Sequence, residues 1–274
     1  MESEIADATH QKDLASAASS IFLSCRPISR KGDQTPASWS HEIKAPLEAA
    51  VREGLAEFEQ LNLSPVDRMI ASWGRALRLY SEHWPVLDGD EEVPPTRAMQ
   101  EAARVVAEEE VSRISGGRIT VDDLDGESRL AVIALGINGL GAFAFDDALQ
   151  MSKSLNLALQ HKSGNYRADP EMVAYNNETD PAKAAPLAKK GSKLRLLAPS
   201  ERDRQRLDRP QTAWDVLGGL IIQYREGGVV AARNYLSANG RAESEALRGL
   251  LQVWADECGD EDLRREACLI DYEL

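Results

Sequence analysis

The sequence is poor in aromatic residues, and it contains no long apolar run. Phe, Trp and Tyr make up only 5% of the 274 residues, so a core has to be built mainly from Leu, Ala, Val and Ile. No apolar run approaches the roughly 18 to 20 residues that a membrane-spanning helix needs. The acidic first residues also differ from the basic start of a secretory signal. These absences predict a soluble protein with no membrane partner.

Cysteine and histidine are scarce, and they lack the spacings of metal or catalytic sites. The odd count of three cysteines (Cys25, Cys258, Cys268), without CxxC spacing, favours reduced thiols and a cytoplasmic location. Cys258 and Cys268 either meet across two terminal helices or, as is more common, are small buried residues. None of the four histidines has a His or Cys partner at ligand spacing, so we predict no metal site. A GxSxG elbow for Ser/His/Asp catalysis is also missing.

Net positive charge is lacking too, because 45 acids outnumber 32 Lys and Arg and leave a net charge of −13. Such a chain repels DNA as a whole, so nucleic-acid contact requires a local cationic surface. Residues 187–209 supply one, with eight Lys or Arg against three acids. Within this segment, Lys189, Lys190, Lys193 and Arg195 flank a Gly-Ser pair, which is typical of a hairpin or of the wing of a winged helix. We predict that these four residues contact DNA phosphates, and the alternative is a solubilising hairpin.

Helix signals dominate the rest of the chain. Apolar residues recur every three or four positions over residues 39–61, which predicts a helix with one buried face. Ser64 and Pro65 are a typical helix start, and Gly116 with Gly117 is a typical helix end. Further helices are expected from Pro65 to about Trp84 and over residues 94–115, 127–140, 146–159, 212–226, 228–238 and 242–257, with a last one from Glu261.

Strand signals are few. Residues 19–25 resemble a short, doubly buried strand, and such a strand needs neighbours on both sides. Residues 193–197 give a short strand signal, whereas residues 160–190 are polar and weakly periodic and predict a long loop or insert. The predicted fold is mainly α, a multi-helix C-terminal region with one orphan N-terminal strand and a short β-hairpin or wing. The expected divisions are a residual strand of an upstream α/β domain (1–27), a helical domain (28–160), a polar insert with the basic hairpin (161–210) and a C-terminal helical bundle (211–274).

Motifs for methyl transfer are absent. A glycine-rich cofactor turn should follow a strand, but the nearest match, Gly136 to Phe143, lies in or after a predicted helix, so a helix contact or helix end explains it better. The double proline Pro94-Pro95 lacks the polar residue before it and the aromatic residue after it that base-methylating enzymes carry. We therefore predict no catalytic and no cofactor-binding residue in this chain.

The order of several short motifs resembles that of a known family. The motifs are the strand-like Ser20 to Pro27, the helix start Ser64-Pro65-Val66-Asp67, the segment Lys193-Leu194-Arg195-Leu196-Leu197, Thr212-Ala213-Trp214-Asp215-Val216 and the turn Glu226-Gly227-Gly228. Their order is similar to the C-terminal region of large adenine-specific DNA methylase-like proteins that bear a domain of unknown function and are associated with anti-phage defence. The chain departs from that family at Trp73-Gly74-Arg75, where a Gly-Pro-Gly is usual, and in its longer, more polar segment 160–190.

The resemblance implies a function for the chain. It would be the accessory region of a DNA adenine-N6 methyltransferase-like protein, with an upstream methyltransferase domain or subunit, and DNA, as its partners. S-adenosylmethionine is implied for the full-length family and not for this chain, whose enzymatic role the sequence leaves open. The alternative, from a different functional class, is a stand-alone acidic helical subunit that binds proteins in a defence complex.

Overall fold

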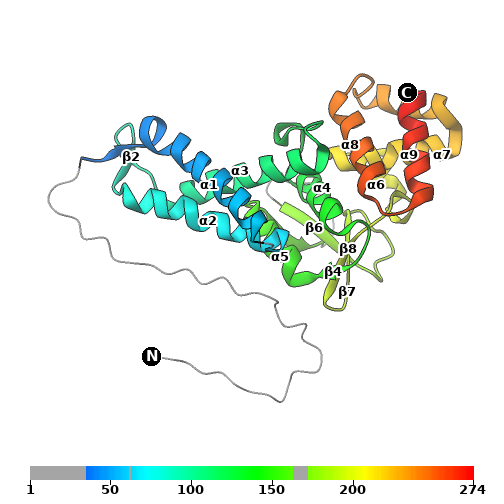
Figure 1. Ribbon diagram of the computed structural model, residues 1–274. Coiled ribbons are helices and arrows are strands. Elements are labelled where there is room, and N and C mark those ends of the chain that lie inside the picture. The colour runs from blue at the N-terminus through cyan, green and yellow to red at the C-terminus, as the bar shows by residue number, and fades with distance from the viewer. Residues whose placement is uncertain (1–34, 62, 163–171) are drawn as a thin grey trace, which may run out of the picture.

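The computed structural model describes residues 35–61, 63–162 and 172–274, and Figure 1 shows how they are arranged. Helices make up most of the described chain, so the prediction of a mainly α fold is confirmed. The first three long helices lie on one side of the five-stranded sheet, and the last helices lie on the other side (Figure 1). The predicted orphan strand at residues 19–25, and with it the division 1–27, lies outside the described residues.

The N-terminal helices follow the predicted pattern. Ile43, Leu47 and Val51 are fully buried, as their spacing on one helical face predicts. The Ser64 hydroxyl caps the second helix by accepting a hydrogen bond from the Asp67 backbone N–H at 3.1 Å. The predicted helices are therefore confirmed. Their bounds are a π-helical turn at Trp39–Ile43, α1 at Lys44–Gln60, α2 at Pro65–Glu82 and α3 at Pro95–Ser115.

A small sheet lies at the end of the helices where α1 begins (Figure 1). Its first and second strands are parallel, and its second and third are antiparallel. The chain then passes through a short 3-10 helix at Val121–Asp123 into α4, which begins where the Asp125 carboxylate accepts the Ser128 backbone N–H at 2.9 Å. The bounds are β1 at Ala37–Ser38, β2 at Val86–Asp88, β3 at Glu91–Glu92 and α4 at Gly126–Asn138.

The central sheet has five strands in the order β4-β8-β7-β6-β5. The pairings β5–β6 and β6–β7 are parallel, whereas β7–β8 and β4–β8 are antiparallel. Helix α5 follows β4 directly and leads into β5. The bounds are β4 at Phe143–Ala144, α5 at Phe145–Ser154, β5 at Ala158–His161, β6 at Met172–Asn177, β7 at Leu187–Lys190 and β8 at Lys193–Leu196.

This sheet corrects two sequence predictions. The segment 160–190 is not one long loop, because β6 and β7 lie within it. The predicted wing is not a free hairpin either, because β6 pairs with β7 on one side and β4 pairs with β8 on the other. Strand β6 escaped prediction because its two asparagines have low strand propensity. The buried Asn176 side chain compensates, since its Nδ2 donates to the carbonyls of Ala185 at 2.9 Å and Leu187 at 2.8 Å. The predicted division between residues 160 and 161 falls inside β5.

The C-terminal helices pack around two tryptophans. Trp214 and Trp254 are both buried, and their rings meet edge to face with 6.0 Å between centroids. The two helices predicted over residues 212–226 and 228–238 are confirmed, because α7 consists of two helices that meet at a kink at Gly228, where φ is +65° and ψ is −161°. Cys258 is buried as predicted, but Cys268 is exposed, and both thiols are free. The bounds are a 3-10 turn at Pro199–Glu201, α6 at Arg204–Asp208, α7 at Ala213–Ala238, α8 at Glu245–Glu257 and α9 at Glu261–Glu273.

A close approach within these helices leads to a stability prediction. Gly219 lies against Tyr235, whose hydroxyl donates to the Leu207 carbonyl at 2.8 Å. A Cβ at Gly219 would overlap the Tyr235 hydroxyl and lie 2.8 Å from the Leu207 oxygen. Gly219→Ala is therefore expected to lower the free energy of unfolding by about 1–3 kcal/mol, measured by urea unfolding followed by circular dichroism.

The adjacent glycine offers a matched control. A Cβ at Gly218 would approach a methyl group of Leu207 at 3.0 Å, and that side chain can shift. Gly218→Ala should therefore cost much less, because alanine also favours the helix by about 1 kcal/mol over glycine. Equal unfolding midpoints for the two variants would contradict the overlap argument.

Candidate functional site: the lysine-bearing hairpin

The predicted basic residues lie on the hairpin of β7 and β8. The two strands join through Gly191 and Ser192, and Gly191 has a φ of +61°, a left-handed conformation that glycine adopts at little cost. Lys190 pairs directly with Lys193 across this turn, and both side chains are exposed. Among the described residues, neither ammonium group has a carboxylate within 4 Å. The fold therefore places two uncompensated positive charges side by side at the tip of the hairpin.

Lys189 has a different environment. As the residue next to Lys190 in the strand, it points to the opposite face of the sheet. Its ammonium nitrogen lies 3.9 Å from the centroid of the Phe145 ring and 5.7 Å from that of Tyr175. This is cation–π geometry, which is worth about 0.5–1 kcal/mol at an exposed site. Lys189 thus fastens the hairpin to α5 and β6, and its charge is separated from those at the tip.

Arg195 is engaged by two carboxylates. One of its terminal nitrogens lies 2.8 Å from Glu178 and 2.6 Å from Glu201, and the other donates to Glu201 at 2.8 Å. Hydrogen bonds from Arg195 are the largest cause of the lowered pKa values of both Glu178 and Glu201. Arg195 lies on the same face as Lys193, but its charge is offset by these partners.

Two acids that directly follow the edge strand β4 limit where an anion can bind. Strand β4 pairs with β8, and the Phe145 backbone N–H donates to the Ser192 carbonyl at 2.9 Å. Asp146 and Asp147, both exposed, follow immediately in the first turn of α5. Burial is the largest cause of the raised pKa of Asp147, and the carboxylates of Asp67 and Asp146 contribute. An anion bound near this edge of the sheet therefore also meets negative charge from the first turn of α5.

A buried ionic cluster connects this part of the chain to the C-terminal helices. Arg202 donates to the Ala184 carbonyl and to Asp215 Oδ1, both at 2.6 Å. Arg206 lies 2.7 Å from Asp215 Oδ2, and the side chains of all three charged residues are at most 5% exposed. Both arginines belong to the basic segment 187–209, which the sequence suggested as a cationic surface. Two sequence features could have indicated that these arginines are buried. They are the spacing of four residues between the arginines and the Thr-x-x-Asp helix start at Thr212.

Glu127 completes the cluster from α4. Its carboxylate accepts a hydrogen bond from the Thr212 hydroxyl at 3.2 Å, while its other oxygen is buried without a hydrogen-bond partner. Burial, together with the nearby carboxylate of Asp215, raises the pKa of Glu127 to about 8, although Arg202 and Arg206 oppose the shift. Glu127 is therefore mostly protonated at neutral pH, and it lies in the core and not in an accessible cleft.

The motifs considered for methyl transfer have structural roles. Gly136 lies inside α4, where a Cβ would meet the Ile114 side chain at 2.6 Å, and Gly139 ends that helix with a φ of +58°. Pro94 and Pro95 begin α3. The interpretation of both motifs as helix features is confirmed. Within the described residues, no group of three or more His, Cys, Asp and Glu is placed to hold a metal ion.

Comparisons with known proteins give no match. No family model matches the sequence, and neither the curated proteins nor the solved structures contain a significant match. In the described part of the chain, no helix combines the length and apolar character needed to cross a membrane.

Proposed function

We propose that this chain is a non-catalytic accessory module that contacts the phosphate backbone of DNA through Lys190 and Lys193. The observation that carries the proposal is the direct pairing of these two exposed lysines across a tight turn. Like charges directly opposite each other on a sheet are unfavourable, and a phosphate bound between them offsets that repulsion. The resemblance of the sequence to adenine-specific DNA methylase-like proteins supports a methyltransferase domain or subunit as the partner that carries out the chemistry.

The position of the tip suits this role. The turn between β7 and β8 lies at the lower edge of the fold in Figure 1, away from the bulk of the helices. Lysine contacts to phosphate position a protein on DNA and read no sequence, so the methyltransferase partner has to supply the choice of site. The other two predicted residues support the tip: Lys189 holds it against two aromatic rings, and Arg195 holds it against two carboxylates.

The proposal predicts a specific loss of salt dependence. Lys190→Gln together with Lys193→Gln should weaken binding to duplex DNA, and the log–log salt slope should fall by about 0.9 for each lost phosphate contact. The effect should be nearly independent of DNA sequence. The measurement is fluorescence anisotropy of labelled duplexes of two unrelated sequences over a series of salt concentrations, with the whole chain.

A charge-matched double variant provides the control. Lys44 on α1 and Lys153 on α5 are exposed and lie on helices outside the β7–β8 hairpin, and Lys44 lies 3.9 Å from Glu101. Lys44→Gln with Lys153→Gln changes the net charge by the same amount and should leave the slope as in the parent. Equal slopes for the two double variants, or no DNA binding by the parent at low salt, would rule out the hairpin as a DNA contact.

A second function is favoured by one observation. Leu269 and Tyr272 are neighbours on α9 and are 47% and 88% exposed, respectively. An exposed aromatic side chain that becomes buried and desolvated in a complex is typical of the anchors that dominate many protein interfaces. If the parent does not bind DNA, a protein partner captured at high salt would support a protein-binding subunit. Capture should then be lost on Tyr272→Ser but kept on Leu61→Ser, which changes another exposed apolar position.

A further inference from the structure

We propose that a pocket between α7, α8 and the end of α9 binds a small carboxylic acid with an apolar body. The pocket has a volume of about 220 Å³ and lies outside the hairpin site. Its floor consists of leucines from two helices, Leu220 and Leu236 from α7 and Leu247 and Leu251 from α8. All four leucines are at most 6% exposed. An apolar group of matching size would bury its surface against this floor.

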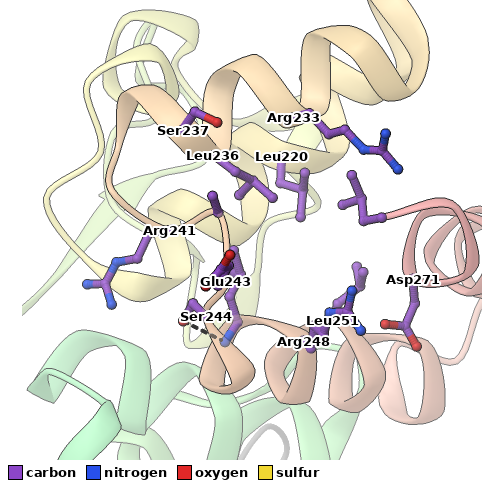
Figure 2. A pocket seen from close by; sticks show the side chains of 13 residues that line it. Leu220, Arg233, Leu236, Ser237, Arg241, Glu243, Ser244, Arg248, Leu251 and Asp271 are labelled. Atoms are coloured by element: carbon purple, nitrogen blue, oxygen red, sulfur yellow. Dashed lines mark hydrogen bonds between the residues drawn. The ribbon is translucent and has the colours of Figure 1, made fainter.

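The rim of the pocket is cationic. Arg233, Arg241 and Arg248 all line it, and all three are exposed. Figure 2 shows Arg233 and Arg241 on opposite sides of the leucines, with the Arg241 side chain extending outward and with Glu243, Ser244 and Arg248 lower in the view. Within the described ranges, none of these three guanidinium groups has a carboxylate within 4 Å. The Arg233 side chain donates one hydrogen bond, to the backbone carbonyl of Glu273 at 2.7 Å.

Most of the other described arginines do have a carboxylate partner. Of the 20 arginines that the structure describes, 14 form an ion pair with an acid. Three of the remaining six line this single pocket. In a chain with a net charge of −13, acids are plentiful, so three unpaired guanidinium groups around one apolar floor indicate a place for an external anion. Arginine is also the residue that best matches a planar carboxylate.

The other polar groups of the lining select the class of anion. Glu243 and Asp271 also line the pocket, and Asp271 accepts a hydrogen bond from the Gln252 side chain at 3.0 Å. Because acids stand beside the arginines in this lining, the site suits a singly charged carboxylate better than a doubly charged phosphate. The Ser244 hydroxyl caps α8 by accepting the Leu247 backbone N–H at 3.3 Å, so the positive end of that helix dipole faces the same rim.

The size of the pocket limits the ligand. Pockets for drug-sized ligands span about 300–1,000 Å³, so this one fits an acid no larger than an amino acid. The proposed ligand is a carboxylate attached to a branched aliphatic or aromatic group. Two kinds of molecule carry such a group: a free organic acid, and a peptide whose last side chain is apolar. Both place the carboxylate at the arginine rim and the apolar body on the leucine floor.

The test uses the whole chain and 4-methylpentanoate as the probe, with 4-methylpentanamide as its uncharged counterpart. Isothermal titration calorimetry should show millimolar or tighter binding of the acid and at least about tenfold weaker binding of the amide, which is about 1.4 kcal/mol. The double variant Arg241→Gln with Arg248→Gln should bind the acid more weakly by a similar factor. Arg209→Gln with Arg264→Gln removes two other exposed arginines that lack ion pairs, and it should leave binding unchanged.

A pocket-filling variant separates binding from folding. Ala242 is exposed and lines the pocket, so Ala242→Trp should abolish binding while the urea midpoint stays that of the parent. An acetylated tripeptide ending in leucine, compared with its C-terminal amide, distinguishes the two sources: tighter binding of its acid form than of 4-methylpentanoate identifies a peptide end. Absence of binding by the parent, or unchanged affinity in the Arg241/Arg248 double variant, would overturn the proposal.

Discussion

Replacing Asp215 by alanine is expected to lower the free energy of unfolding by about 3–5 kcal/mol. The Asp215 side chain is fully buried and bridges Arg202 and Arg206, at 2.6 and 2.7 Å. It also accepts the backbone N–H groups of Gln211 at 3.0 Å and Thr212 at 3.3 Å, the two residues that precede α7. Without this carboxylate, two buried guanidinium groups lose the negative charge that lies 2.6 and 2.7 Å from them. Urea unfolding followed by circular dichroism measures the loss.

Two further variants test the reason for that loss. Glu82→Gln breaks the exposed pair that Arg78 and Glu82 form at 2.9 Å, and exposed pairs of this kind contribute little to stability. Replacing Arg202, Arg206 and Asp215 together by Met, Met and Leu removes the buried charges as a set and should restore much of the stability lost by Asp215→Ala. An Asp215→Ala midpoint no lower than that of Glu82→Gln would show that the cluster does not stabilise the fold.

The protein is expected to lose stability as the pH rises from about 5 to about 8, because of Glu127. Its pKa rises from an ordinary value of 4.5 to about 8 in the folded protein, through burial and the neighbouring Asp215 carboxylate. Between these two pH values the folded state holds a proton that the unfolded state has released. The free energy of unfolding therefore falls with increasing pH, by up to about 1.4 kcal/mol per pH unit for one proton. Above the folded pKa the fall ends, because Glu127 is then charged in both states.

Glu127→Gln isolates this contribution from the other titrating groups. Glutamine keeps an oxygen that can accept the Thr212 hydroxyl, but it never gains a charge. The variant should match the parent at pH 5 and be more stable than the parent at pH 8.5, with the difference growing over the interval. Urea unfolding at five or six pH values gives this difference directly. Parallel pH profiles for the two proteins would show that Glu127 does not titrate in this range.

The helices could be predicted because their signals are local. The apolar stripe of α1, the Ser64 cap and the glycine after α3 each act within a few residues of the chain, and the structure has all three. The five-stranded sheet could not be predicted in the same way. Strand β6 is stabilised by a buried asparagine whose side chain donates hydrogen bonds to Ala185 and Leu187, nine and eleven residues further along the chain. Such distant partners leave no periodic pattern in the sequence.

The candidate site was predictable in part for the same reason. A Gly-Ser pair between lysines identifies a tight turn, and the structure places Lys190 and Lys193 at that turn. The partners of the other basic residues are distant in sequence: Glu178 lies 17 residues from Arg195, and Asp215 lies 13 residues from Arg202. A count of charge along the sequence therefore overstates the cationic surface, because it includes arginines that are paired or buried.

The order of strands in the central sheet also has a consequence for synthesis of the chain on the ribosome. Phe143 of β4 pairs with Leu194 of β8, so the first strand of the sheet to be made finds its partner only after the residues between them have been translated. At ordinary elongation rates of about 5–20 residues per second, that wait is roughly 3–10 s. The β7–β8 hairpin, in contrast, can close as soon as it emerges. The nascent chain therefore holds an unpaired β4 edge for seconds, and a chaperone that binds extended apolar segments would find its target around Phe143.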